Sequence, residues 1–217
     1  MRSHRSVFSL ALILLGVTNG FVVQDATSRT CKIGSLKSTA TEVDSAVEDL
    51  LSFARKVGPV GSLATEEEQT KVVELATKLA EKRGISAPAK ASLRGIHDLV
   101  YSAAPGGSSG RLFGPVYGKV TQDFLEDDVT FINAVKIGPV EISLQAEKIV
   151  KNDTTNIVKF KKSQVKAFGK TVVEKDINGG GVWKYLFMGE VQDADGNKKL
   201  LRVMETPSLF VIEQPIP

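Results

Sequence analysis

Cysteine and histidine are nearly absent from this chain. Its 217 residues include one cysteine, Cys31, and two histidines, His4 and His97. The part after residue 40 therefore has no disulfide, thiol nucleophile or cysteine metal ligand, and its one histidine has no evident catalytic partner. We predict no catalytic residue, no metal site and no cofactor, and we interpret His97 as a partly buried structural histidine.

The N-terminal apolar run is too short to cross a bilayer, which requires about 20 residues. It extends from Val7 to Leu15, follows Arg2 and Arg5, and precedes small residues. This order of basic, apolar and small segments is typical of a secretory signal peptide, which we place at residues 1–20. An uncleaved amphipathic anchor is the alternative.

Acidic residues are scarce in the next segment, residues 21–40, which has three basic residues, one acid and several serines and threonines. Such a composition is typical of an organelle transit peptide. A signal peptide followed by a transit-like segment beginning with Phe21 resembles the two-part address of plastids acquired by secondary endosymbiosis. This resemblance implies a location in the plastid (chloroplast), and the alternative is a disordered spacer on a secreted protein.

A strong net charge is also missing once this N-terminal region is set aside. The whole chain has a formal charge of +3, but residues 1–40 hold five Lys/Arg and one acid. The remainder has 23 basic and 24 acidic residues, so no global field attracts nucleic acid and we expect no nucleic-acid partner. About 175 residues remain, which is enough for one domain with a substantial core.

The glycine-rich stretch SSGRLFGPVYGKVTQDF, residues 108–124, lacks the features of a phosphate-binding loop. Valine follows its Gly-Lys pair where a P-loop needs serine or threonine, and no helix begins after the glycines as a dinucleotide fingerprint requires. We interpret Gly114 and Gly118 as points where a strand bends around a small barrel. Apolar Leu112 and Phe113, beside a glycine- and serine-rich loop, are placed at the barrel mouth.

Two amphipathic helices are predicted before the strands. Residues 41–56 place apolar side chains at helical spacing, and Gly58-Pro59 ends this helix. Thr65 begins the second helix, because Glu68 three residues later completes a capping box, and Gly84 ends it. Each helix has one apolar face, so we expect both to pack against another part of the fold.

From Leu93 onward, apolar and polar residues alternate as they do in β-strands. About nine short runs with turn signals between them favour a barrel or a sandwich, and Gly138-Pro139 is one expected turn. The predicted fold class is mainly β, an antiparallel β-barrel preceded by two amphipathic helices. The expected strands span residues 96–101, 116–121, 129–137, 140–147, 156–161, 165–174, 182–191, 198–205 and 209–214.

Three segments carry a recognisable pattern: LRGIHDLVYSAAPGGSSGRLFGPVYGKVTQDF, FINAVKIGPVEISLQAE and LLRVMETPSLFVIEQ. They resemble the first barrel motif, the next hairpin and the closing strands of the plastid-lipid-associated protein family, the plant-type fibrillins (PAP/fibrillin). The helix pair before them is also similar, so the resemblance covers residues 48–214. Matching positions are Leu93, Gly95, Leu99, Tyr101, Ser102, Gly114-Pro115-Val116, Leu201-Arg202-Val203 and Leu209-Phe210-Val211.

This resemblance implies a lipocalin-like barrel that binds hydrophobic molecules without enzymatic activity at plastid lipid globules (plastoglobules) and thylakoids. The implied ligand types are carotenoids, quinones, tocopherols and fatty acids. Independently, barrels of about eight strands are just wide enough to hold one small ligand. The chain departs from the family pattern at His97, where tryptophan is usual, at Lys199-Leu200, where an acid is usual, and at Glu205-Thr206, where Arg-Gly is usual.

Apolar side chains on the strands are the predicted lining of a lipophile pocket, and packed core is the alternative for them. Trp183, Tyr185 and Phe187 are expected on one face of a single strand, because they occur at every second position. The other predicted lining residues are Leu112, Phe113, Phe131, Val140, Ile142 and Leu144.

A lysine cluster is the predicted contact with a lipid-globule or thylakoid surface, because basic side chains are attracted to anionic headgroups. A solvated outer face is the alternative. The predicted residues are Lys159, Lys161, Lys162 and Lys166. The expected partner is therefore a hydrophobic small molecule or lipid.

The segment QDADGNKK, residues 192–199, partly matches a calcium loop. Lys198 occupies the place where such a loop requires glycine, so we interpret Asp195-Gly196 as a hairpin turn.

The sequence divides into a signal peptide (1–20), a transit-like segment (21–40), a helix pair (41–92) and a barrel (93–217), with the last two forming one domain. Other functions remain open: an isomerase or cyclase acting on a lipophile in the barrel, a protein-interaction scaffold with a filled barrel, or a secreted lipocalin.

Overall fold

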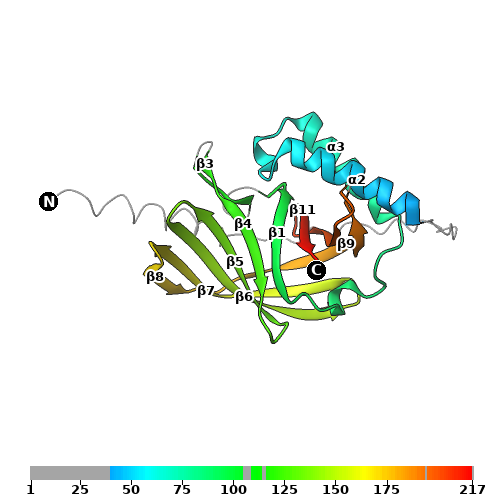
Figure 1. Cartoon of the computed structure of the whole chain (residues 1–217). Coiled ribbons are helices and arrows are strands. Elements are labelled where there is room, and N and C mark those ends of the chain that lie inside the picture. The colour runs from blue at the N-terminus through cyan, green and yellow to red at the C-terminus, as the bar shows by residue number, and fades with distance from the viewer. Residues whose placement is uncertain (1–39, 105–108, 114–115, 194, 217) are drawn as a thin grey trace.

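The structure, a computed structural model, describes residues 40–104, 109–113, 116–193 and 195–216 (Figure 1). The predicted signal peptide and nearly all of the transit-like segment lie outside these residues, as do Gly106, Gly107 and Gly114. Two helices and a large antiparallel sheet form the described part of the chain.

The two predicted helices are confirmed as α2 (Ala40–Val57) and α3 (Glu66–Ala80), with short 3₁₀ turns η1 (Gly61–Leu63) and η2 (Pro88–Lys90) after them. Thr65 caps α3 as expected: its hydroxyl accepts the N–H of Glu68, and the Glu68 carboxylate accepts the N–H of Thr65. None of the described helices has the length and apolarity needed to cross a membrane.

Eight strands form a closed antiparallel ring, which we call the barrel. Their order is β6-β5-β4-β1-β11-β10-β9-β7, and pairing between β7 and β6 closes it, while β8 adds to β7 as a ninth strand. The predicted antiparallel barrel is therefore confirmed. The bounds are β1 Gly95–Ser102, β4 Lys119–Phe124, β5 Thr130–Ile137, β6 Val140–Asn152, β7 Thr155–Ala167, β8 Lys170–Asp176, β9 Gly180–Gln192, β10 Lys198–Glu205 and β11 Leu209–Pro215. β2 (Arg111–Phe113) and β3 (Val116–Tyr117) form a separate two-stranded sheet.

One predicted strand, residues 165–174, is wrong because the chain reverses in its middle. β7 ends at Ala167 and β8 begins at Lys170, which pair with each other. Phe168 and Gly169 between them both have positive φ, 51° and 76°, as a two-residue type I′ hairpin requires. The alternation of Val165, Ala167 and later residues continues through this turn, so periodicity alone did not indicate it.

The backbone at Gly118 lies very close to the neighbouring strand β5, as the position of a glycine within a strand run suggests. It separates β3 from β4 and donates its N–H to the Gly110 carbonyl oxygen at 3.0 Å. A Cβ added at Gly118 would collide with the carbonyl oxygen of Lys136 on β5. The strand therefore needs glycine at this corner because no side chain fits there.

Two hydrophobic cores lie on opposite sides of the same strands. The first is outside the barrel, where apolar faces of α2 and α3 pack on β1, β9, β10 and β11 (Figure 1). It includes Leu50, Leu51, Leu79, Leu201 and Val203. The second lies inside the barrel and consists mainly of aromatic and larger aliphatic side chains. The predicted apolar face of each helix thus has a partner surface.

Candidate functional site

The barrel interior is built around the ring of Phe124, at the end of β4. Phe131 of β5 stacks on it with ring centroids 5.0 Å apart, and Trp183 of β9 meets its edge at 6.2 Å. Phe131 and Trp183 also contact each other at 4.9 Å. These three strands therefore place a continuous aromatic surface inside the barrel, of the kind that binds apolar molecules.

Arg202 is the most unusual residue of this interior. It lies on β10 between Leu200 and Met204, which face the same apolar core, and it is fully buried. Its Nη2 donates to Gln122 Oε1 at 2.7 Å, and its guanidinium carbon lies 5.3 Å from the centroid of the Phe124 ring. The Arg202 Nε and Nη1 have no hydrogen-bond partner in the described chain.

Tyr185 and Asn156 continue the polar side of the interior. The Asn156 side-chain nitrogen donates to the Tyr185 hydroxyl oxygen at 3.3 Å, and both residues are buried. Burial lowers the pKa of Arg202, and the nearby Tyr185 opposes that change. An arginine keeps its proton in proteins, so this positive charge stays inside the barrel.

His97 is completely buried beside the same aromatic ring, whereas only partial burial was expected. Its Nε2 lies 2.7 Å from the Leu93 carbonyl oxygen, and its ring meets Phe124 edge-on at 5.4 Å. Burial, followed by the charge of Arg202, lowers the pKa of His97 to about 3. At neutral pH the imidazole is therefore uncharged and donates to the backbone through Nε2–H.

Lys148 of β6 is the second interior cation, but it has a counterion. Its Nζ lies 3.4 Å from Asp128 Oδ1, donates to the Ala91 carbonyl oxygen at 3.3 Å and sits 5.8 Å from the Phe124 ring centroid. Burial lowers the pKa of Lys148 and the Asp128 carboxylate opposes this. Arg202 is thus the interior charge that has no acidic partner in the described chain.

Most of the predicted pocket residues lie on the inner side of the barrel wall. Phe131, Trp183 and Tyr185 belong to the interior core. Ile142 is buried, whereas Val140 and Leu144, which share its side of β6 by alternation with Ala146, are half-buried. The side chains of Leu112 and Phe113 lie outside the described part of the structure. Whether these residues contact a ligand stays a prediction.

Phe187 is the exception, and the expectation that it shares a face with Trp183 and Tyr185 is wrong. Met204 pairs with Tyr185 while Val203 pairs with Phe187, so Leu186 is an extra residue that forms a β-bulge in β9. One extra residue reverses the facing of the side chains that follow it. Phe187 therefore packs outside the barrel, in the core beneath α2 and α3.

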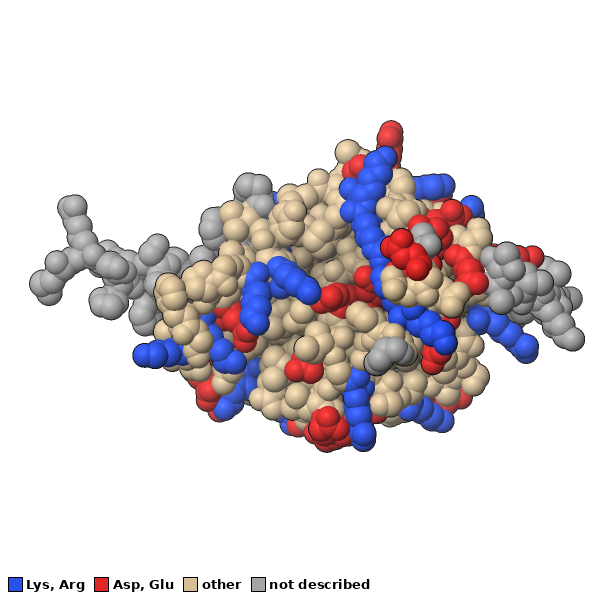
Figure 2. All heavy atoms as spheres, in the orientation of Figure 1, with Lys and Arg blue, Asp and Glu red and all other residues tan. Residues whose placement is uncertain are grey.

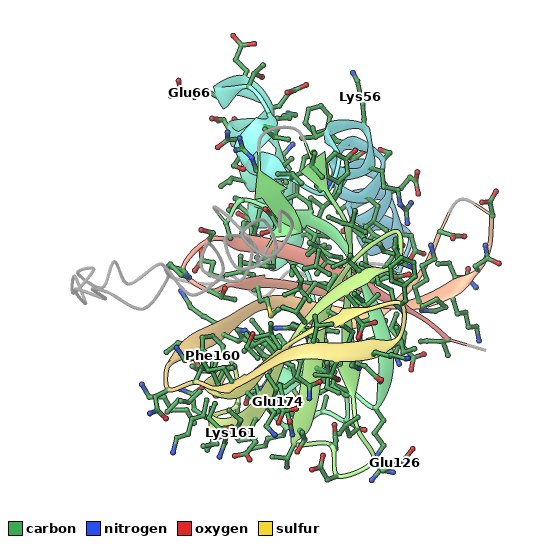
Figure 3. All side chains as sticks on the ribbon, turned by 90° about the vertical axis from the view of Figure 1, so that its left-hand side faces the viewer. Lys56, Glu66, Glu126, Phe160, Lys161 and Glu174 are labelled. Carbon is green, nitrogen blue, oxygen red and sulfur yellow. The ribbon has the colours of Figure 1, made fainter. Side chains whose placement is uncertain are left out.

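The predicted lysine cluster lies on the outer side of β7, and three of its four members are paired with glutamates. Figure 3 shows Lys161 and Glu174 on the side of the molecule opposite Lys56 and Glu66 of the helix pair. On the face shown in Figure 2, basic and acidic side chains are likewise interspersed. The Nζ–carboxylate distances are 2.9 Å for Lys161–Glu147, 2.7 Å for Lys162–Glu174 and 3.3 Å for Lys166–Glu141, while Lys159 is exposed.

The Asp195-Gly196 turn is confirmed. The N–H groups of Asp195 and Asn197 donate to Asp193 Oδ1, at 3.1 and 2.9 Å, and Lys199 Nζ lies 2.9 Å from Asp193 Oδ2. The hydrogen bond from Lys199, then that from the Asn197 backbone, lowers the pKa of Asp193 to about 2. Its oxygens thus already serve the turn, and the described residues include no cluster of three or more potential metal ligands.

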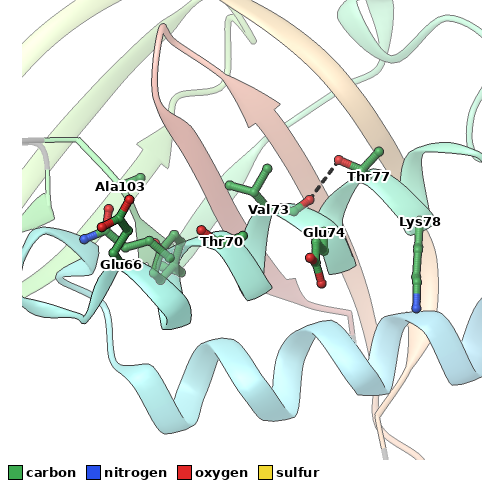
Figure 4. A pocket seen from close by; sticks show the side chains of 9 residues that line it. Glu66, Thr70, Val73, Glu74, Thr77, Lys78 and Ala103 are labelled. Carbon is green, nitrogen blue, oxygen red and sulfur yellow. Dashed lines mark hydrogen bonds between the residues drawn. The ribbon is translucent and has the colours of Figure 1, made fainter.

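A shallow groove lies outside the barrel, along α3 (Figure 4). Its volume is about 590 Å³, and Val73 and Thr77 of α3 face it together with Tyr101 of β1 and Ala103 just after β1. None of the predicted pocket residues whose side chains the structure describes lines it, so the groove and the described barrel interior are separate features.

Alternation of apolar residues did not identify the polar interior residues Gln122, Asn156 and Arg202. A signal for Arg202 was present, because a charged residue between Leu200 and Met204 interrupts the apolar face of a strand. Phe124 was missed because it ends the run that begins near Gly118, and only the strand pairing shows that it lies at the centre of the site.

Comparison with known proteins gives one match to a family. The model of that family, PAP_fibrillin, matches residues 42–211, which includes both helices and nearly all of the barrel. No significant match was found among curated proteins or among solved structures. Membership of this family implies plastid association and a structural role with lipids. On the extent of this match, the chain belongs to the PAP_fibrillin family.

Proposed function

We propose that this protein binds a hydrophobic small molecule inside its barrel and has a structural, non-enzymatic role at plastid lipid globules or thylakoids. The observation that carries this proposal is the aromatic interior formed by Phe124, Phe131 and Trp183 within a closed ring of strands. An eight-stranded barrel is about wide enough to hold one small ligand. Carotenoids, quinones, tocopherols and fatty acids are the ligand types that family membership supports.

Binding inside the barrel is tested by the fluorescence of Trp183, because it is the one tryptophan of the chain. A prenylated quinone quenches a tryptophan only when it comes close to it, so titration of the full chain should give saturable quenching. Two buried phenylalanines provide a matched pair, since Phe131 lies inside the barrel and Phe187 outside it. We expect Phe131→Leu to weaken the affinity at least several-fold and Phe187→Leu to leave it within twofold.

Two results would count against ligand binding. One is an absence of saturable quenching by quinone, together with no lipophile extracted from protein purified from its native source. The other is equal weakening by both phenylalanine variants, which would place the quinone outside the interior.

For docking at a lipid surface, the described structure favours the hairpin tip between β7 and β8 over the lysine cluster. Phe168 at this tip is 82% exposed, and Lys166 and Lys170 flank it. The Phe168 N–H donates to the Pro139 carbonyl oxygen at 2.9 Å, which holds this tip beside the β5–β6 turn. An exposed aromatic ring between lysines suits the boundary between headgroups and acyl chains.

Flotation of the full chain with galactolipid vesicles containing anionic lipid tests this docking. We expect Phe168→Ser to reduce the bound fraction several-fold. Ile96→Ser is the matched control, because Ile96 is also an exposed apolar residue, 58% accessible, but lies where β1 pairs with the end of β4, far from this tip along the strands. Equal loss in both variants would contradict docking through the β7–β8 tip.

A further inference from the structure

Arg202 presents a positive charge, with unused hydrogen-bond donors, to the inside of an otherwise apolar barrel. The guanidinium has five N–H donors, and the described structure uses one nitrogen, Nη2, in its bond to Gln122. Nε and Nη1 remain without partners although the side chain is fully buried. Gln122 is neutral and therefore cannot balance the charge.

The other titratable groups around Arg202 do not balance its charge either. His97 on β1 is neutral, and Lys148 on β6 is a cation already paired with Asp128. Tyr185 on β9 carries a hydroxyl whose oxygen accepts a hydrogen bond from Asn156, so its own O–H is left to donate. The part of the chain that the structure describes forms no ion pair between the Arg202 guanidinium and a carboxylate.

A buried charge without a counterion is costly, because the protein interior replaces only part of the hydration that the ion loses. Arginine is almost never fully buried unless something else provides the opposite charge. The free donors of Arg202 adjoin the aromatic surface of Phe124, where an apolar molecule would lie. A negatively charged group at one end of the ligand would therefore provide the counterion that Arg202 lacks.

We propose that Arg202 binds the carboxylate of an amphipathic ligand, a long-chain carboxylic acid whose tail packs on the aromatic interior. This inference rests on the proposed function, because it assigns the chemical class of ligand to the same interior. A planar guanidinium matches the two oxygens of a carboxylate, and the Tyr185 hydroxyl can donate a further hydrogen bond. One unpaired cation balances one negative charge, which favours a carboxylate over a doubly charged phosphate.

The test compares oleate with oleyl alcohol, which has the same tail and no charge. Both are titrated into the full chain at neutral pH, below their aggregation concentrations, by displacement of a fluorescent apolar probe. We expect the native chain to bind oleate at least tenfold more tightly than the alcohol, which corresponds to about 1.4 kcal/mol. Arg202→Met should abolish this preference by weakening oleate binding while leaving that of the alcohol within twofold.

Arg55→Met is the matched control, because Arg55 is an exposed arginine that pairs with Glu213 outside the barrel. It should keep the preference of the native chain for oleate. Equal affinities of the native chain for oleate and oleyl alcohol would overturn the inference about Arg202 and leave lipophile binding intact. Binding of neither compound, nor of the apolar probe itself, would instead overturn the proposed function.

A second measurement needs no variant, so it decides the matter even if Arg202→Met fails to fold. Oleate labelled with ¹³C at its carboxyl carbon is bound to the native chain and titrated by NMR. A neighbouring guanidinium favours the ionised form, so the pKa of the bound carboxyl should lie below that of a free carboxylic acid. A raised pKa would show a carboxyl that is buried away from Arg202 and would overturn the proposal.

Discussion

His97 connects the chemistry of the barrel interior to the pH dependence of folding. Its pKa is about 3 in the folded protein and 6.5 for an ordinary solvated histidine, so between these values the unfolded chain binds a proton that the folded chain does not. The stabilisation from the neutral imidazole is fully present above pH 6.5 and is lost as the pH falls towards 3. As the pH falls through this range, the titration of His97 alone should lower the free energy of unfolding by up to about 1.4 kcal/mol per pH unit.

The variant His97→Gln tests this, since an amide can still donate to the Leu93 carbonyl oxygen but does not titrate. Urea unfolding of both chains at pH 7, 6 and 5 should show a shallower decrease for the variant. If the stability difference between the two chains is the same at all three pH values, the histidine does not titrate as its burial implies.

Gly118 gives a second prediction for a single residue. In Gly118→Ala the new methyl group meets the Lys136 carbonyl oxygen, which cannot move without disturbing the β4–β5 pairing. We expect a loss of about 2–4 kcal/mol in the free energy of unfolding, measured by urea denaturation. Gly181→Ala in β9 is the control, because an added Cβ there has no atom within 4 Å, and its effect should be below about 1 kcal/mol.

At the scale of elements, α3 depends on a local cap as well as on its buried face. Thr65→Ala removes the acceptor for the Glu68 N–H and should lower the free energy of unfolding by about 1 kcal/mol. Thr77→Ala changes the same residue type within the helix, where the hydroxyl bonds the exposed Val73 carbonyl oxygen, and should cost less than about 0.5 kcal/mol. A similar loss in both variants would mean that the capping box adds nothing beyond helix propensity.

The elements were predictable where a local rule determines them. The capping box fixed the start of α3, and simple alternation indicated β10 at its observed bounds, residues 198–205. Local rules failed where a single residue changed the pattern. The Phe168-Gly169 turn split an apparently continuous strand, and the bulge at Leu186 moved Phe187 to the other core. Gln122, Asn156, Tyr185 and Arg202 come from four different strands, β4, β7, β9 and β10, so only the ring closure brings them together.

For the whole molecule, closure of the barrel divides the strands into two classes of stability. β10 is paired on both sides and buries both faces, whereas β8 pairs only with β7 in the described structure and is almost entirely exposed. In native-state hydrogen exchange, the amides of Leu201 and Val203 should exchange only through global unfolding, whereas β8 should exchange at least about a hundredfold faster through local opening. If the β8 amides were protected as strongly as those of β10, then β8 would unfold together with the eight-stranded ring instead of opening locally.

The position of the helix pair limits how the molecule can be oriented at a lipid surface. Because α2 and α3 cover the outer surface of β1, β9, β10 and β11, that surface is not available for contact with lipid. In the docking proposed above, the opposite side of the barrel, led by the β7–β8 tip, would face the lipid surface. In that proposed orientation the groove along α3 would face away from the lipid surface.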